Sequence, residues 1–275
     1  MVNLYYNPTA GGGRAQQVYE QVKDLLVAHG EAVFVPSAQR SLLLQRSGLY
    51  VVIGGDGTFN TLLNELVHPE EYQFVLLPAG TSNSLSTFLS PNEDPLSKLR
   101  RFLAAPRFYT LDLPQLRIEG KDYRFINEAS AGFAAAIARE VEQRQTKRLF
   151  NRLKLNELAY IATAFRCWRT DEPVWISMCN NHRVSGDLYP CVNANPTDGL
   201  IDIYSLACPR VRLPFELTRL VRAKEDKASD YVTRRQVTKA EFDFEQALPI
   251  EIDGNPLPPT THLELSLYEH PIKVF

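Results

Sequence analysis

The first third of the chain alternates short apolar runs with stretches in which apolar residues recur every three or four positions. The recurrence is found after the glycines at 11–13 and again after Thr58, and its spacing places apolar side chains on one face of a helix. Alternating strands and helices are typical of βαβ units, so the pattern predicts a parallel sheet with helices on its faces. The runs that predict its strands are 4–7, 33–35, 50–53 and 74–77.

From about Asp112 onward, short β-like runs separated by turn residues replace this alternation. Two helical stretches, 133–168 and 212–224, interrupt them. We therefore predict an α/β domain over 1–112 and a β-sandwich domain over 113–275, whose last segment is a candidate for return to the first domain. The β-like runs are 114–118, 123–127, 174–179, 183–189, 200–205, 241–244, 250–252 and 262–268.

Composition narrows the function classes by exclusion. Of 275 residues, 44% are hydrophobic and 23% charged, as in ordinary globular proteins, and the net charge of −2 provides no overall basic field for nucleic acid. The four cysteines form no C-x-x-C pair and the five histidines no i, i+4 pair, which argues against zinc and dithiol sites. The first residues read as a strand and not as a signal peptide, and no uncharged stretch is continuous enough for a membrane helix. These features favour a cytoplasmic protein.

The first glycine-rich loop, 7–14, lies between a predicted strand and a predicted helix. Backbone amides at a helix N-terminus bind anions, so the loop is a candidate phosphate site. It matches neither the G-x-x-x-x-G-K-[ST] nor the G-x-G-x-x-G pattern, because no lysine follows and Gln16 occupies the last glycine position. Glycines that serve only to turn the chain explain this loop equally well.

The second loop, 54–60, carries more information. A buried strand leads into two glycines, Asp56, a third glycine and Thr58, which we expect to cap the following helix. Glycine lets the backbone approach a polyphosphate closely, and Asp56 is placed to hold Mg²⁺ or an ordered water against it. A tight Asp-Gly turn explains the turn but not three glycines around one acid.

The third loop, 77–84, again follows a strand and precedes a helix. Its hydroxyl and amide side chains can reach phosphate or ribose, and a cluster of N-cap residues is the structural alternative. A serine nucleophile elbow is disfavoured, since the second glycine of G-x-S-x-G is missing.

Together the three loops resemble those of the diacylglycerol kinase catalytic-domain family of lipid kinases, which includes sphingosine and ceramide kinases and shares its GGDGT loop with NAD kinases. The resemblance extends over essentially the whole chain and implies that ATP binds between an α/β domain and a β-sandwich domain. The residues it assigns to the nucleotide are Asn7, Pro8, Thr9, Ala10, Gly11, Ser37, Gly54, Gly55, Asp56, Gly57, Thr58, Phe59, Asn60, Thr81 and Asn83.

The second half contributes further matches to the family, at 111–113, 125–133, 195–202 and 252–255. The resemblance implies a structural Mg²⁺ held by Asp198 and the carbonyls of Asn195 and Leu200, although an Asp-Gly hairpin turn explains the same residues. It assigns Asp112 to the network at the phosphates, together with Asp56. It also places a general base at the Asp253 turn.

Three positions depart from the family pattern. Ser84 and Thr61 stand where the family usually has acids, and Asn255 replaces the glutamate that acts as base. An amide cannot accept a proton at neutral pH, so the hydroxyl proton is expected to pass to Asp253 directly or through water. Sphingolipid-type members also lack the acid at the position of Ser84, so that change can signal a different lipid.

We therefore predict an ATP- and Mg²⁺-dependent kinase that transfers the γ-phosphoryl group to a lipid hydroxyl. A non-catalytic nucleotide- or lipid-binding protein and an NAD kinase-like enzyme remain as alternatives. Basic residues interleaved with leucines over 139–155 predict peripheral contact with the inner face of a membrane, although a solvated helix face explains them equally well. A homodimer is left open, and nucleic acid is not expected.

Overall fold

The fold was analysed in a computed structural model, in which two compact units are distinguished. The first unit comprises Met1–Leu113, Pro196–Asp198 and Tyr268–Phe275, and the second comprises Pro114–Asn195 and Gly199–Leu267. The structure describes residues 2–28, 32–36, 48–137, 174–184, 189–213, 215–216, 219 and 229–275. Ser37 and the basic stretch 139–155 therefore lie outside the described residues.

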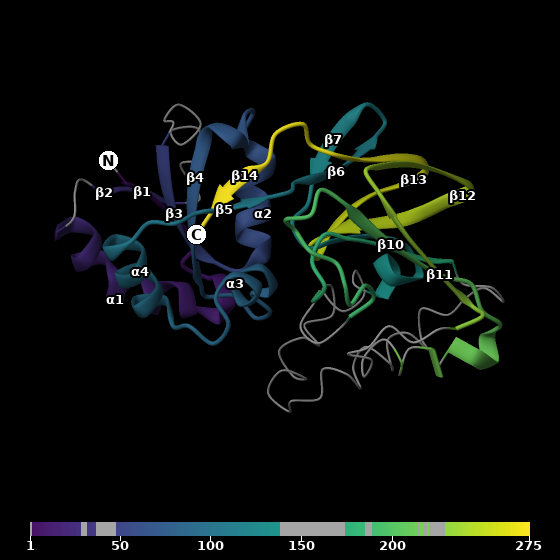
Figure 1. The fold of residues 1–275 in the computed structure, drawn as a ribbon, viewed down its shortest axis with the longest axis horizontal. Helices are drawn as coiled ribbons and strands as arrows, with labels where there is room; N and C mark the ends of the chain where they lie inside the picture. Colours follow the sequence, from purple (N-terminus) through teal and green to yellow (C-terminus); the bar gives the residue numbers. More distant parts are fainter. Residues whose placement is uncertain are drawn as a thin grey trace. The chain divides into compact units, whose positions relative to one another are not determined.

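The first unit contains a six-stranded sheet in the order β2-β1-β3-β4-β14-β5 (Figure 1). Its first four strands in this order are mutually parallel, as the sequence predicts, and β14 extends the sheet parallel to β4 and antiparallel to β5. The C-terminal strand β14 therefore belongs to the same sheet as the N-terminal strand β1, as expected for a last segment that returns to the first domain. The strands are β1 (Val2–Tyr6), β2 (Ala32–Pro36), β3 (Gly48–Gly54), β4 (Tyr72–Pro78), β5 (Tyr109–Leu111) and β14 (Ile272–Val274).

Helices pack on both faces of this sheet because its central strands are apolar on both faces. Val51 and Val75 lie in one cluster with side chains of α1 and α4, while the neighbouring Phe74 meets Phe59 of α2, with ring centroids 5.0 Å apart. Successive side chains of a strand point to opposite faces, so α1 with α4 and α2 cover different faces. The helices are α1 (Arg14–Ala28), α2 (Asp56–Glu65), α3 (Ser84–Leu89) and α4 (Pro95–Ala104), with short 3₁₀ turns η1 (Ala10–Gly12) and η3 (Pro69–Glu71).

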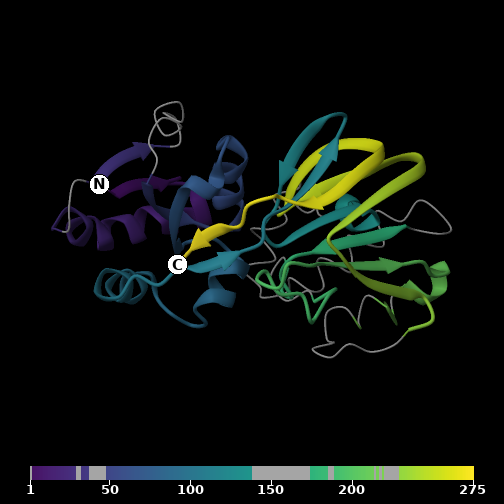
Figure 2. The ribbon, with the colours of Figure 1, turned by 45° about the horizontal axis from the view of Figure 1, so that its top comes forward.

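The second unit is built on one antiparallel sheet in the order β11-β10-β9-β8-β12-β13-β6-β7. Figure 2 shows the long strands β12 and β13, in yellow-green and yellow, as part of this unit. Leu116 of β6 and Ile203 of β10 come from strands far apart in this order, yet they share one buried cluster, so the sheet curves around a common core. The strands are β6 (Pro114–Ile118), β7 (Lys121–Arg124), β8 (Glu128–Gly132), β9 (Trp175–Cys179), β10 (Ile201–Leu206), β11 (Val232–Val237), β12 (Lys239–Ile252) and β13 (Asn255–Leu267), with the turn η4 (Arg210–Arg212).

The predicted fold class, an α/β domain with a parallel sheet followed by a β-sandwich domain, is confirmed in that the second unit is a separate antiparallel β structure around its own core. Within the described ranges, no helix combines the length and the apolar character needed to cross a bilayer.

Candidate functional site

The three glycine-rich loops meet at one edge of the first sheet. They follow β1, β3 and β4, which are parallel neighbours, so their carboxyl ends lie side by side. The amide of Ala79 donates to the carbonyl of Gly54 at 2.8 Å, which ties the third loop to the second. A Cβ atom on Gly55 would lie 2.8 Å from the Cα of Gly80, so the two backbones touch where side chains would separate them.

Asparagine side chains hold two of these loops in shape. Asn83 adopts a left-handed conformation with φ of 49°, and its side chain accepts from the Gly80 amide at 2.8 Å and donates to the Gly80 carbonyl at 2.9 Å. In the first loop the Asn7 side chain accepts hydrogen bonds from the amide and the hydroxyl of Thr9, at 3.1 and 2.8 Å. Both asparagines therefore stabilise the conformation of their own loops, and their assignment to the nucleotide stays a prediction.

Arg14 is a residue of this edge to which the sequence analysis gave no role. Its Nε donates to the carbonyl of Gly11 at 3.2 Å, and its Nη2 donates to the carbonyl of Gly80. The guanidinium thus bridges the first and third loops through neutral acceptors, and no carboxylate among the described residues pairs with it. The result is an exposed positive charge at the meeting point of the glycine loops.

Asp56 connects the second loop to the third. One of its carboxylate oxygens accepts from the amide of Ser84 at 2.7 Å and the other from the amide of Leu85 at 3.2 Å. The prediction that Thr58 caps α2 is wrong, because the helix already begins at Asp56 and Gly55 is its N-cap residue. Thr58 lies inside the helix because the chain turns helical directly after the second glycine.

Removing one acceptor of Asp56 provides a test of this connection. We expect Asp56→Asn to lower the free energy of unfolding by about 1–3 kcal/mol, because an amide offers one acceptor oxygen where the carboxylate uses two. Urea denaturation of both proteins measures the difference. Asp24→Asn, at an exposed position of α1, is the matched control and should leave the midpoint unchanged. Equal midpoints for Asp56→Asn and the wild type would contradict the bridging role.

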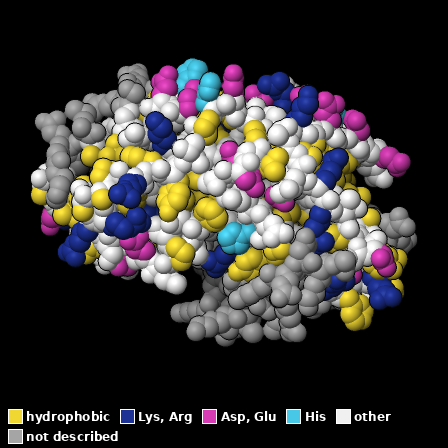
Figure 3. All heavy atoms as spheres, viewed as in Figure 1, with side chains coloured by type: hydrophobic (Ala, Val, Ile, Leu, Met, Phe, Trp, Pro, Cys, Tyr) yellow, Lys and Arg dark blue, Asp and Glu magenta, His cyan; other side chains and the backbone are white. Residues whose placement is uncertain are grey.

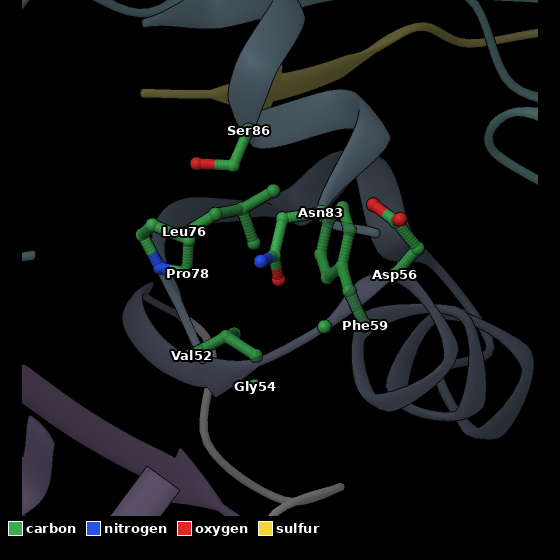
Figure 4. A pocket seen from close by; sticks show the side chains of 9 residues that line it. Val52, Gly54, Asp56, Phe59, Leu76, Pro78, Asn83 and Ser86 are labelled. Carbon is green, nitrogen blue, oxygen red and sulfur yellow. The ribbon is translucent and has the colours of Figure 1, made fainter. Parts of the chain in front are cut away.

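A small pocket lies beneath these loops (Figure 4). Phe59 forms part of its wall but is 1% exposed and packs against Phe74, so it is first of all a core residue. Asn60 is also buried, whereas Thr81 is exposed. The pocket is lined by Val52, Gly54, Gly55, Asp56, Phe59, Leu76, Pro78, Asn83 and Ser86.

In the second unit, Asp253 and Gly254 form the two-residue turn between β12 and β13. Both have positive φ, 46° and 86°, as a type I′ hairpin turn requires. The Asp253 carboxylate accepts from the amides of Ile126, Asn127 and Glu128 at 2.7, 2.8 and 3.2 Å. Three amide donors stabilise its negative charge and attach the hairpin to the segment before β8. Asn255, the position of the missing glutamate, is the first residue of β13 and only partly buried.

Two buried glutamates accompany this turn, and neither was identified from the sequence. Glu251 accepts from the amide of Gly254 at 2.7 Å and from the Ser130 hydroxyl at 3.0 Å. Burial raises the pKa of Glu128 to about 7, with a further contribution from the charge of Asp253. Burial, together with the charges of Glu128 and Asp253, also raises the pKa of Glu251 well above its usual range. The Asp253 turn is therefore accompanied by two carboxyl groups, of Glu128 and Glu251, whose protonated forms are favoured by burial.

The remaining predicted residues occupy the following places. The amide of Asp112, directly after β5, donates to the carbonyl of Pro196 at 2.7 Å. Asp198 is exposed and belongs to the first unit, whereas Asn195 and Leu200 belong to the second. Among the residues that the structure describes, no three His, Cys, Asp or Glu side chains are grouped as metal ligands. The metal assignment, which needs one carboxylate and two carbonyls, stays a prediction.

The chain is similar in sequence to a family of kinases and to several bacterial relatives. The family model described as "Diacylglycerol kinase catalytic domain" matches residues 1–115, the part of the chain that carries the three loops. "Putative lipid kinase YtlR" of Bacillus subtilis is 23% identical over 98% of this chain and 97% of its own length. "Probable lipid kinase YegS-like" of Chromohalobacter salexigens is 27% identical over 74% of this chain and 68% of its own.

The fold has relatives among solved structures. A diacylglycerol kinase from Bacillus anthracis str. Sterne superposes with a TM-score of 0.70 and 15% sequence identity, covering 99% of this chain and 95% of that one. At this identity the likeness concerns the fold. The resemblance to the diacylglycerol kinase catalytic-domain family that the three loops predict is therefore confirmed by family model, relatives and fold together.

Proposed function

We propose that the protein is a lipid kinase that transfers the γ-phosphoryl group of ATP to a lipid hydroxyl. The observation that carries the proposal is the meeting of three glycine-rich loops around Arg14, whose guanidinium donates to the neutral carbonyls of Gly11 and Gly80 and pairs with no carboxylate among the described residues. A polyphosphate is an anion that suits these loops, because backbone amides and a guanidinium can both donate hydrogen bonds to its oxygens. The names of the relatives support the lipid branch of the family.

Phosphoryl transfer needs positioning and charge neutralisation more than covalent chemistry. In this proposal the glycine loops hold the phosphates, Arg14 neutralises part of their charge, and Asp56 keeps the second and third loops together. Asp112 extends the network at the phosphates. Oxygen ligands suit Mg²⁺, so Asp198 with the carbonyls of Asn195 and Leu200 would hold a structural ion, which stabilises the local chain.

The proton of the acceptor hydroxyl requires a base, and Asn255 cannot serve. We assign this role to Asp253, directly or through a water. Three amides already donate to Asp253, so its carboxylate is held in one orientation.

The experiment that tests the proposal is incubation with γ-labelled ATP, Mg²⁺ and mixed micelles of diacylglycerol, monoacylglycerol, sphingosine, ceramide and undecaprenol, followed by lipid extraction. Label in one lipid supports the kinase and identifies its acceptor. NAD is included as a separate acceptor, since label there would favour the NAD kinase-like alternative. If Asp56→Asn and Asp253→Asn both left lipid phosphorylation unchanged, the assignment of the site would be wrong.

For Arg14→Gln we expect nucleotide affinity to fall about 10- to 100-fold, as for the loss of one charge-assisted hydrogen bond. Calorimetric titration with ATP measures it. Arg107→Gln, which removes an exposed arginine of the same unit, is the control and should bind as the wild type does. Unchanged affinity in Arg14→Gln would remove the guanidinium from the phosphate site.

A second candidate function is non-catalytic binding of nucleotide. Asn255 together with the three amide donors on Asp253 favours it, since the chain then lacks a strong base at this turn. ATP binding without label in any acceptor is the expected result for this function. Restoration of transfer by Asn255→Glu would show that the missing glutamate alone is responsible.

A further inference from the structure

A buried lysine lies next to the pocket of the first unit. Lys98, on α4, is 0% exposed, which is rare for a lysine because transfer of an ammonium group out of water is costly. Its Nζ donates one hydrogen bond, to the Ser86 hydroxyl at 3.1 Å. In the part of the chain that the structure describes, no carboxylate lies within ion-pair distance of it.

Ser86 connects this lysine to the glycine loops. It lines the pocket beneath them together with Gly54 and Asp56, as Figure 4 shows. The hydroxyl that accepts from Lys98 thus belongs to a residue of the pocket wall.

The charges around Lys98 leave its ammonium under-compensated. The charge of Glu93 favours the protonated lysine, but the Glu93 carboxylate is engaged by the guanidinium of Arg101 at 2.8 Å, and Arg101 itself opposes protonation of the lysine. The neighbouring Asp94 accepts from two amides at the start of α4. The Asp56 carboxylate, which also lines the pocket, is engaged by the α3 amides. Burial accordingly lowers the pKa of Lys98 to about 8.

We propose that Lys98 is a buried cation of the nucleotide site and that the polyphosphate of the bound nucleotide is its counter-ion. The charge of Lys98 acts on the nucleotide through the Ser86 hydroxyl. This inference rests on the proposed function, because it requires an anionic nucleotide at the glycine loops. It assigns Lys98 as a positioning residue. Its consequence is that binding of the nucleotide and protonation of the lysine are coupled, each favouring the other.

Proton uptake on binding is the readout, since a merely structural lysine would not produce it. The titration uses ATP at pH 8 in two buffers of different ionisation enthalpy. We expect the wild type to take up about half a proton, because a group with a pKa near the working pH is half deprotonated before the ligand arrives. The apparent affinity should fall about tenfold between pH 7 and pH 9, in proportion to the protonated fraction.

Three variants separate this coupling from other effects. Lys98→Met should take up about half a proton less than the wild type and lose the pH dependence of affinity, and replacement of a buried charge by an apolar side chain of similar size should preserve the fold. Ser86→Ala should reduce the uptake while Lys98 stays in place. Lys23→Met removes an exposed lysine of α1 and should behave as the wild type.

A measurement on the wild-type protein makes the test independent of how the variants fold. Side-chain ¹³C NMR of the lysines should show one that titrates near pH 8 in the free protein and at a higher pH in the presence of ATP. ATP binding with equal proton uptake in the wild type and Lys98→Met, or without a shift of that titration, would overturn the role of Lys98 and leave the proposed function standing. Failure of the wild type to bind ATP would overturn both.

Discussion

Gly11→Ala is expected to lower the free energy of unfolding by about 3 kcal/mol or more and to prevent nucleotide binding, while Gly12→Ala next to it should cost about 1–2 kcal/mol. Both glycines have positive φ, 60° and 70°, so both substitutions place an alanine in the left-handed region. They differ in their surroundings. A Cβ atom on Gly11 would overlap the Ala79 carbonyl oxygen, whereas one on Gly12 would meet nothing within 4 Å.

The comparison isolates the contact between the first and third loops, since the backbone strain is common to both variants. Urea denaturation measures the stability of each, and ATP titration measures the site. If Gly11→Ala were no less stable than Gly12→Ala, the two loops would not approach each other as closely as the structure shows.

The second large effect is a loss of stability as the pH rises. An unfolded glutamate ionises near its ordinary pKa of 4.5, whereas folded Glu128 keeps its proton up to a pKa of about 7. Between these values the native state holds more protons than the unfolded state, so the free energy of unfolding falls with rising pH. We expect a loss of about 3 kcal/mol between pH 4.5 and pH 8, to which Glu251 adds with the same sign.

Glu128→Gln should flatten this part of the curve and raise the stability at pH 8 relative to the wild type, because a neutral amide carries no ionisation cost. Urea denaturation from pH 5 to pH 8 tests it. Glu245→Gln, at an exposed position of β12, is the matched control and should follow the wild type. A wild-type curve that does not fall, or one that Glu128→Gln reproduces, would show that Glu128 ionises normally in the folded protein.

The α/β part of the fold could be predicted from local pattern. Val18 and Val22 recur at helical spacing and are buried on α1, and the apolar run that includes Val51 and Val52 is a central strand. Such periodicity reflects burial directly, so it can be interpreted without knowledge of distant contacts. Helix termini depend on backbone geometry that residue type signals less strongly, which is why the sequence predicts Thr58 as a cap whereas the helix begins at Asp56.

The candidate site also has parts that the sequence predicts and parts that only the structure shows. The glycine loops and the turn at Asp253 are motifs of adjacent residues, and the family resemblance they predict is confirmed. Arg14 and Glu128 lie in segments that the sequence singles out, 7–14 and 125–133, but no role is predicted for either, and Lys98 lies in no motif. Their importance arises from partners that are distant in sequence, such as Gly80 for Arg14 and Asp253 for Glu128.

The sequence by itself thus determined the two-part fold class, the succession of strands and helices in the α/β part and the resemblance to the family, because each is encoded in spacing between near neighbours. Only the tertiary structure decided that Asp56 ties two loops together, that Asp253 is held by three amides, and that a lysine is buried beside the pocket. The physical reason is that hydrogen-bond partners, burial and desolvation depend on which distant segments pack together, and these quantities set the charge state and orientation of each group.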